Sequence, residues 1–200
     1  MVSIIAVIKG IHDRVFGAVE HALDGWFPGL FARFAFAATL YLYFLNSART
    51  KVGDGLAGFF SISDNAYYQI ALPAVEAAGG DVSRIGFLPW GLVVTAGTYA
   101  EFLLPLLVVL GLFARLAALG MIGFIGVQTL VDITVHKVGP ETIGAWFDRF
   151  PDAAILDQRL LWLVPLVFVV IRGAGYVSLD ALLERWWTGS RPAQTGYASA

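Results

Sequence analysis

The sequence contains no cysteine and little charge. Its 200 residues include 13 Lys and Arg and 15 Asp and Glu, so charged side chains make up 14% of the chain, against about 25% in ordinary soluble domains. The absence of cysteine excludes disulfides, Cys-ligated clusters and a cysteine nucleophile. A redox role would therefore require a bound cofactor or a partner chain. The net charge of −2 argues against a nucleic-acid partner, which selects for a basic stripe.

Apolar residues, by contrast, are abundant. They make up 58% of the chain, and the mean hydropathy is +0.74. A soluble domain with so few charges would have to leave large apolar patches in water. The composition therefore predicts an integral membrane protein whose first partner is the lipid bilayer.

Long apolar stretches predict the architecture. Four of them have roughly the 17–25 residues needed to cross about 30 Å of hydrocarbon, and they lie at about 30–48, 91–112, 116–136 and 160–177. Only residues 113–115 separate the second and third stretches, which requires an antiparallel hairpin. The predicted fold class is an all-α membrane protein, with a four-transmembrane-helix bundle over residues 28–187.

The connections and chain ends carry weaker signals. In the long loops, 66–78 predicts a short helix broken near Pro73, and 143–150 predicts a short amphipathic piece. Residues 1–27 show apolar side chains at steps of three and four and lack a basic signal-peptide start, so they predict an N-terminal amphipathic helix in the membrane interface. A helix packed on the bundle is the alternative. Residues 188–200, rich in Gly, Ser, Pro and Ala, predict a disordered tail.

The distribution of Lys and Arg bears on orientation. Four spans place both termini on one side of the membrane. The numbers of Lys and Arg on the two sides barely differ, but Arg115 lies in a turn of only three residues. Positive charge in short loops favours the cytoplasmic side. The sequence therefore predicts a bacterial cytoplasmic (inner) membrane protein with both termini in the cytoplasm.

Ionisable side chains within the predicted spans are the candidate functional residues, because a charge at the centre of a span costs at least about 2.5–3.5 kcal/mol. Glu101 lies near the middle of the second span, four residues before Pro105, where the helix is expected to kink. On the third span, Gln128, Asp132 and His136 recur at steps of four. On the first span, four polar residues recur at the spacing that places them on one helix face, namely Thr39, Tyr43, Asn46 and Thr50. Arg49 and Lys51 lie at the outer end of this span.

We expect these polar stripes to converge as one pocket in the outer half of the bundle. The candidates for ligand binding or proton relay are Glu101, Lys51, Asp132, Tyr43, Asn46, Arg49 and Gln128. The alternative is that they only lock helices together or lie at a solvated rim.

Metal and haem binding are not favoured by the sequence. Asp132 and His136, four residues apart, could supply two metal ligands, with Glu101 as a third. This spacing is weak evidence for a metal site, because polar pairs four residues apart are common in helices. Haem b would need two axial imidazoles, and among the three histidines only His136 lies near a span.

Three arginines gather at the opposite, inner end of the predicted spans. They are Arg33, Arg115 and Arg172. We expect them to anchor the helix ends on lipid phosphates.

A resemblance adds to this interpretation. Residues 100–119, AEFLLPLLVVLGLFARLAAL, together with Arg33, NSARTK at 46–51 and GAGYVSLD at 173–180, resemble the DoxX family of small four-helix membrane proteins. The resemblance covers about residues 30–185 and implies the same four-helix fold. It also implies a link to redox or metal stress, because some relatives are the small subunit of a thiosulfate:quinone oxidoreductase and others belong to thiol-redox, oxidative-stress or metal-stress systems. Relatives with paired cysteines cannot guide the chemistry of this chain.

Three functions remain open at this point. The leading one is an accessory subunit that binds a quinone head group, with Lys51 or Tyr43 donating to a carbonyl, Glu101 relaying a proton and electrons coming from a partner redox protein. The second is a proton- or metal-coupled transporter, for which four helices are few unless a homo-oligomer forms and for which the sequence has no inverted repeat. The third is a structural scaffold that docks a partner through the long outer loops.

Overall fold

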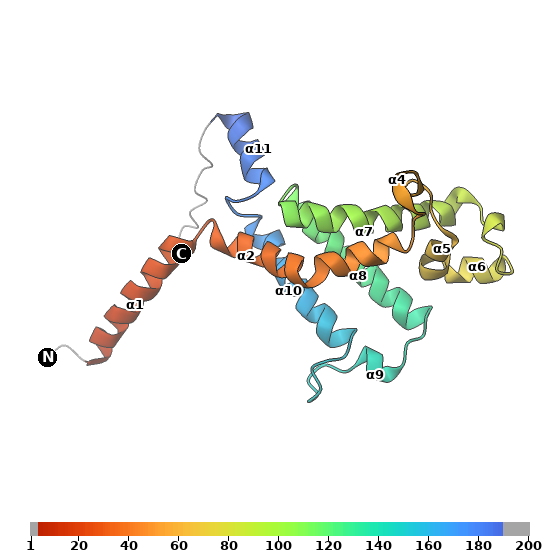
Figure 1. The fold of residues 1–200 in the computed structure, drawn as a ribbon. Helices are drawn as coiled ribbons and strands as arrows, with labels where there is room; N and C mark the ends of the chain where they lie inside the picture. The colour runs from red at the N-terminus through yellow and green to blue at the C-terminus, as the bar shows by residue number, and fades with distance from the viewer. Residues whose placement is uncertain (1–3, 190–200) are drawn as a thin grey trace.

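The computed structural model describes residues 4–189, and this part of the chain is helical with no strand (Figure 1). The predicted all-α class is confirmed. The helix segments that pack together are α2 (Phe27–Phe36), α3 (Leu42–Arg49), α7 (Leu92–Leu110), α8 (Ala114–Thr134) and α10 (Leu156–Arg172). A π-helical turn at Ala37–Tyr41 joins α2 to α3, so these two form one continuous helix.

Three helices are long and apolar enough to cross a membrane. They run over Phe27–Arg49, Phe87–Leu110 and Ala114–Thr134. Only 33%, 28% and 22% of their most apolar windows are buried inside the molecule, so most of their apolar side chains face outward. Such surfaces are compatible with lipid and not with water, which indicates an integral membrane protein. The fourth predicted span corresponds to α10, which at 17 residues is shorter than the other three.

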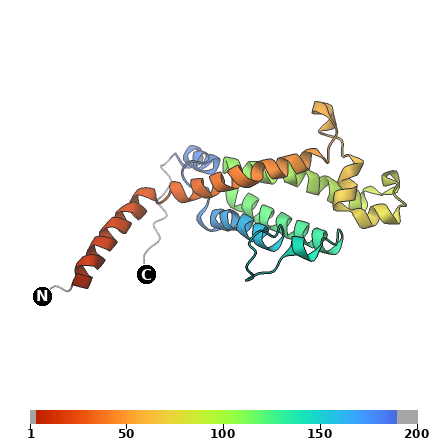
Figure 2. The ribbon, with the colours of Figure 1, turned by 60° about the horizontal axis from the view of Figure 1, so that its bottom comes forward.

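The core lies where these helices cross. α10 packs on α8 and α2, while α7 packs on α8 and α3 (Figures 1 and 2). The largest fully buried apolar side chains come from four of these elements and include Phe36, Phe44, Met121 and Leu166. Ala117 and Ala118 on α8 are also buried. Small residues of this kind let helices approach closely in a membrane.

A compact cap, which we call the outer cap after the predicted orientation, covers the C-terminal end of α3 and the N-terminal end of α7. It contains α4 (Gly55–Gly58), α5 (Asp64–Ile70) and α6 (Leu72–Ala77). α5 packs on α7 through Ala66, Ala71 and Val94. The break between α5 and α6 falls at Ala71, whose φ of −128° and ψ of 39° are not helical. This is close to Pro73, where the sequence predicts a broken helix.

The second outer loop differs from the sequence prediction. It contains α9 (Pro140–Ile143), and the predicted amphipathic piece over 143–150 does not form a helix. The helix ends at once because Gly144 has a φ of +77°, and Phe147 is also left-handed at +65°. Neither conformation continues a right-handed helix.

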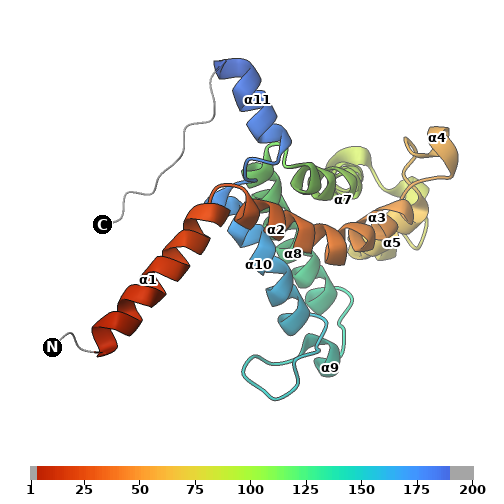
Figure 3. The same cartoon turned by 60° about the vertical axis from the view of Figure 1, so that its left-hand side comes forward.

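Two helices lie outside this core. α1 (Ile4–Leu23) extends away from it and buries none of its residues (Figure 3), so the alternative of packing on the bundle is not observed. Its place in the membrane interface stays a prediction. α11 (Leu179–Thr188) follows α10. Of the predicted tail over 188–200, residues 190–200 lie outside the described residues.

Candidate functional site

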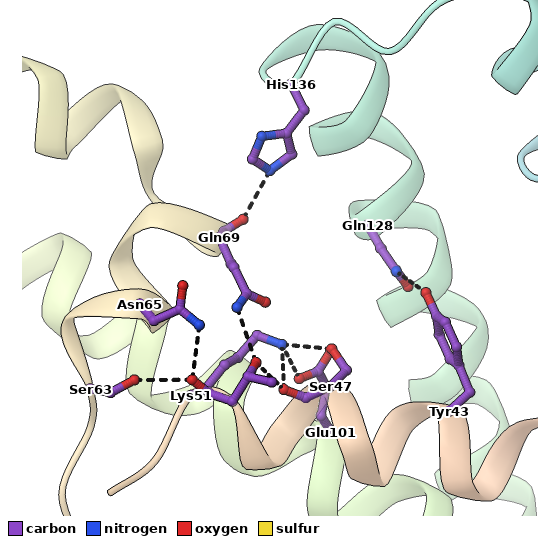
Figure 4. A network of polar contacts seen from close by, with 10 residues as sticks. Tyr43, Ser47, Lys51, Ser63, Asn65, Gln69, Glu101, Gln128 and His136 are labelled. Carbon is purple, nitrogen blue, oxygen red and sulfur yellow. Dashed lines mark hydrogen bonds and ion pairs between the residues drawn. The ribbon is translucent and has the colours of Figure 1, made fainter.

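A buried ion pair joins the first two long helices. Lys51, just beyond α3, donates from Nζ to Oε2 of Glu101 on α7 over 2.6 Å (Figure 4). The two side chains are 4% and 5% exposed. Removing both charges from water carries a desolvation cost that is offset only when the geometry is good and the remaining polar atoms have partners.

Ser47 supplies those partners. Its Oγ donates to Glu101 Oε1 over 3.2 Å and accepts from Lys51 Nζ over 2.8 Å, while Lys51 Nζ also donates to the Ser47 carbonyl oxygen over 3.2 Å. An ammonium has three protons, so each has an acceptor, and both Glu101 oxygens have a donor. Sequence reasoning missed Ser47. The signal was its place four residues before Lys51, which puts both on one helix face.

The outer cap covers this triad by holding the end of α3. Ser63 Oγ and Asn65 Nδ2 donate to the Thr50 carbonyl oxygen over 3.2 and 3.0 Å, and Gln69 Nε2 donates to Thr50 Oγ1 over 3.0 Å. His136 Nε2 lies 3.2 Å from the Gln69 carbonyl oxygen (Figure 4). His136 therefore belongs to the exposed rim of the cap and does not reach the ion pair.

A second ion pair holds the other two long helices together. Arg159 in the first turn of α10 binds Asp132 of α8 through Nη2 and donates from Nη1 to Thr129 Oγ1 over 2.8 Å. Arg159 is 7% exposed. The fourth span predicted from the sequence begins at residue 160, so Arg159 was left outside it and was not a candidate.

Between the two ion pairs lies a partly satisfied polar cluster with aromatic rings. Gln128 Nε2 on α8 donates to the Tyr43 hydroxyl over 3.1 Å, and the Tyr43 ring centroid lies 5.1 Å from that of Trp162 on α10. The Arg159 guanidinium carbon lies 5.9 Å from the Trp162 ring centroid. Gln128 Oε1 and Arg159 Nε are buried without a partner among the described residues. Buried polar atoms are usually hydrogen-bonded, so these two are exceptions.

The expected single pocket is therefore two separate networks. Lys51 and Glu101 come together, whereas Asp132 is held by Arg159 on a different helix pair. Asn46 and Arg49 are exposed and join neither network. Relative to Ser47, whose Oγ contacts Glu101, Asn46 lies about 100° and Arg49 about 200° around α3, because each helical residue advances by about 100°.

A metal is not suggested by these positions. Within residues 4–189 no group of three or more His, Asp and Glu side chains is placed to hold an ion. Asp132 faces Arg159 and His136 faces the Gln69 carbonyl, so the predicted weak metal ligands do not meet.

At the inner end, Arg33 differs from its expected role as a lipid anchor. Its guanidinium is buried and donates to four main-chain carbonyl oxygens. These are Val108 over 3.2 Å, Val109 over 2.8 Å, Ala174 over 3.0 Å and Val177 over 2.6 Å. The first two belong to the last turn of α7, whose free carbonyls attract a cation. Arg33 therefore joins α2, α7 and the segment after α10 from inside the protein.

The other inner-end groups hold the turn between α7 and α8. Asp180 accepts from the Phe113 and Ala114 N–H groups over 2.6 and 2.9 Å and donates its own N–H to the Gly111 carbonyl oxygen. Gly111 has a φ of +68°, and a Cβ there would lie 2.9 Å from Arg33 Cζ. Arg115 is exposed, and Arg172 lies 3.3 Å from Asp24.

Comparisons with protein-family models, curated proteins and solved structures gave no match. Function is therefore inferred from the residues and contacts of this chain.

Proposed function

We propose that the chain is a DoxX-like integral membrane accessory subunit linked to redox or metal stress, with α10 as a fourth span. A helix of 17 residues is about 26 Å long, and the packing of α10 on α2 and α8 supports this assignment. With four spans both termini lie on one side. Arg115 in the short turn between α7 and α8 favours the cytoplasm for that side, and a bacterial inner membrane follows.

The proposed ligand is a quinone head group, bound in the cluster between the two ion pairs. The observation that carries this proposal is the buried Nε of Arg159, a donor without an acceptor among the described residues, which lies near the Trp162 ring and so beside Tyr43. A quinone offers a flat ring for aromatic packing and carbonyl oxygens that accept hydrogen bonds. Small-molecule sites commonly combine apolar walls with a few such polar groups.

The donors follow from the contacts already made. Lys51 has its three protons engaged by Ser47 and Glu101, so it has none left for a ligand carbonyl. Arg159 Nε has a free proton, and no acceptor for the Tyr43 hydroxyl proton is found within residues 4–189. We therefore assign carbonyl binding to Tyr43 and Arg159. Electrons would come from a partner redox protein, since this chain has no thiols.

The test is the quinone content of the purified chain. The full chain is extracted from its membrane in mild detergent, and bound quinone per protein is compared with that of the bulk lipid. We expect enrichment in the wild type, less in Tyr43→Phe, and unchanged enrichment in the control Tyr99→Phe, whose hydroxyl donates to the Phe59 carbonyl oxygen in the outer cap. Equal quinone content in wild type and bulk lipid, or in wild type and Tyr43→Phe, would refute quinone binding at this cluster.

A structural scaffold is the second candidate, and one observation favours it. Every hydrogen-bonding position of the Lys51 ammonium, and both Glu101 oxygens, have partners, as expected of a lock between helices. A scaffold also needs a docked protein. Crosslinking in the native membrane through the outer loops should then capture a defined partner even when Tyr43→Phe is introduced; capture of no protein would exclude the scaffold.

A further inference from the structure

A second site lies at the inner end of the molecule, away from the outer ion pairs. A cleft of about 860 Å³ opens between the last turns of α1, the start of α8, the segment after α10 and α11. Its charged lining residues include Glu20, Asp24, Arg115, Arg172, Asp180 and Glu184. A volume of this size accommodates a small ligand.

Several of these charges already have partners. Arg172 pairs with Asp24 over 3.3 Å, and both oxygens of Asp180 accept main-chain N–H groups. Arg115 and Glu20 are different. Both are exposed and line the cleft, and neither has a charge partner within residues 4–189. The cleft therefore offers one available cation and one available anion that do not neutralise each other.

The Arg115 head lies against the backbone at Gly173, within van der Waals contact of where a Cβ would be. A Cβ at this glycine would lie 3.4 Å from Arg115 Nε and 3.5 Å from Nη2. The φ of Gly173 is +82°, which other residues rarely adopt. The guanidinium thus lies along the backbone that follows α10, with its fork available to an oxyanion in the cleft.

The cleft also lies at one end of the candidate membrane-spanning helices, where a spanning helix meets the lipid head groups. Two of the three candidate spans begin at Phe27 and Ala114, and the third ends at Leu110, all beside this cleft. Trp186 and Trp187 on the adjoining α11 are exposed, and tryptophan is enriched at membrane–water interfaces.

We propose that this cleft binds the head group of an aminophospholipid, with the phosphate at Arg115 and the ammonium at Glu20. A guanidinium binds phosphate oxygens in a forked geometry, and a primary ammonium donates to a carboxylate. An anionic head group without an amine would satisfy Arg115 alone and would face the carboxylate of Glu20. The site therefore selects phosphate accompanied by an amine over phosphate alone.

The experiment uses the detergent-solubilised full chain and native mass spectrometry, with phosphatidylethanolamine or phosphatidylglycerol titrated separately. We expect phosphatidylethanolamine to occupy the site at lower concentration. Arg115→Gln should weaken binding of both lipids about fivefold, as removal of one interfacial arginine implies. Glu20→Gln should weaken only phosphatidylethanolamine and so abolish the preference. Arg84→Gln is the matched control, because Arg84 pairs with Asp81 in the outer loop.

A competition experiment with soluble glycerophosphoethanolamine, at the same concentration as the lipid, distinguishes an intact lipid from a free head group as the occupant of the cleft. We expect it not to displace phosphatidylethanolamine, since it lacks acyl chains. Displacement at equal concentration would overturn a lipid occupant. Equal binding of the two lipids, or an unchanged preference in Glu20→Gln, would overturn the pairing of phosphate with amine. Because both side chains are exposed, the variants are expected to fold, and circular dichroism checks this.

Discussion

Replacing Glu101 by Gln tests whether the buried pair with Lys51 stabilises the protein. The substitution keeps the shape of the side chain and removes its negative charge. It replaces the 2.6 Å contact from Lys51 Nζ to a carboxylate by a contact to a neutral amide. The Lys51 side chain, 4% exposed, then carries a buried charge with no counter-charge.

The expected magnitude follows from that uncompensated charge. Removing one member of a buried ion pair costs about 3–5 kcal/mol, whereas replacing both members by apolar residues of similar volume is often neutral or stabilising. We expect Glu101→Gln and Lys51→Met each to lower the free energy of unfolding by about 3 kcal/mol, a change of about 150-fold in the unfolding equilibrium. The double variant Lys51→Met/Glu101→Met should recover most of that loss.

Reversible unfolding of the full chain in mixed detergent micelles measures these differences. Arg84→Gln, at a surface pair, is the control and should change stability by less than about 1 kcal/mol. Losses below about 1 kcal/mol in both single variants, or a double variant whose loss equals the sum of the single losses, would refute a coupled pair.

Three further substitutions test the other buried contacts. Arg33→Lys should lower the free energy of unfolding by about 3 kcal/mol. In the wild type three guanidinium nitrogens donate to four main-chain carbonyl oxygens, and a single ammonium cannot reach all four. A free energy of unfolding equal to that of the wild type would contradict this role. Asp180→Asn should lower the free energy of unfolding by about 1–2 kcal/mol, because only one oxygen remains to accept from the N–H groups at the start of α8. The rate of amide hydrogen exchange should then rise at Phe113 and Ala114 and stay unchanged at Leu130. Asp132→Asn should cost about 3 kcal/mol by leaving buried Arg159 unpaired, measured by the same unfolding assay; an unchanged unfolding midpoint would show that this pair contributes nothing.

The helical fold could be predicted largely from apolar length. Stretches of 20 or so apolar residues predict spans, and the structure has three helices of that kind, with boundaries within about four residues of the sequence prediction. The break near Pro73 also followed from local chemistry. The segment 143–150, predicted as a short amphipathic piece, shows the limit, because left-handed residues at Gly144 and Phe147 keep it from forming a helix.

The candidate site was less predictable, for a physical reason. The cost of charge in a bilayer singled out Glu101, and helical spacing gives the face that a residue occupies on its own helix. It does not give the partner. Asp132 pairs with Arg159, which lies 27 residues later in the sequence and on a different helix. Arg33 donates to main-chain carbonyl oxygens, one of which is 144 residues away in the sequence. Those contacts depend on how helices rotate against one another, which one sequence does not specify.

Isothermal titration of a short-chain quinone into the full chain tests the central claim most directly. We predict saturable binding of one quinone per chain, about tenfold weaker in Tyr43→Phe because one hydrogen bond worth about 1–1.5 kcal/mol is lost, and unchanged in Tyr99→Phe. Heat that does not saturate in the wild type, or identical affinities in wild type and Tyr43→Phe, would contradict a quinone site between Tyr43, Gln128 and Arg159.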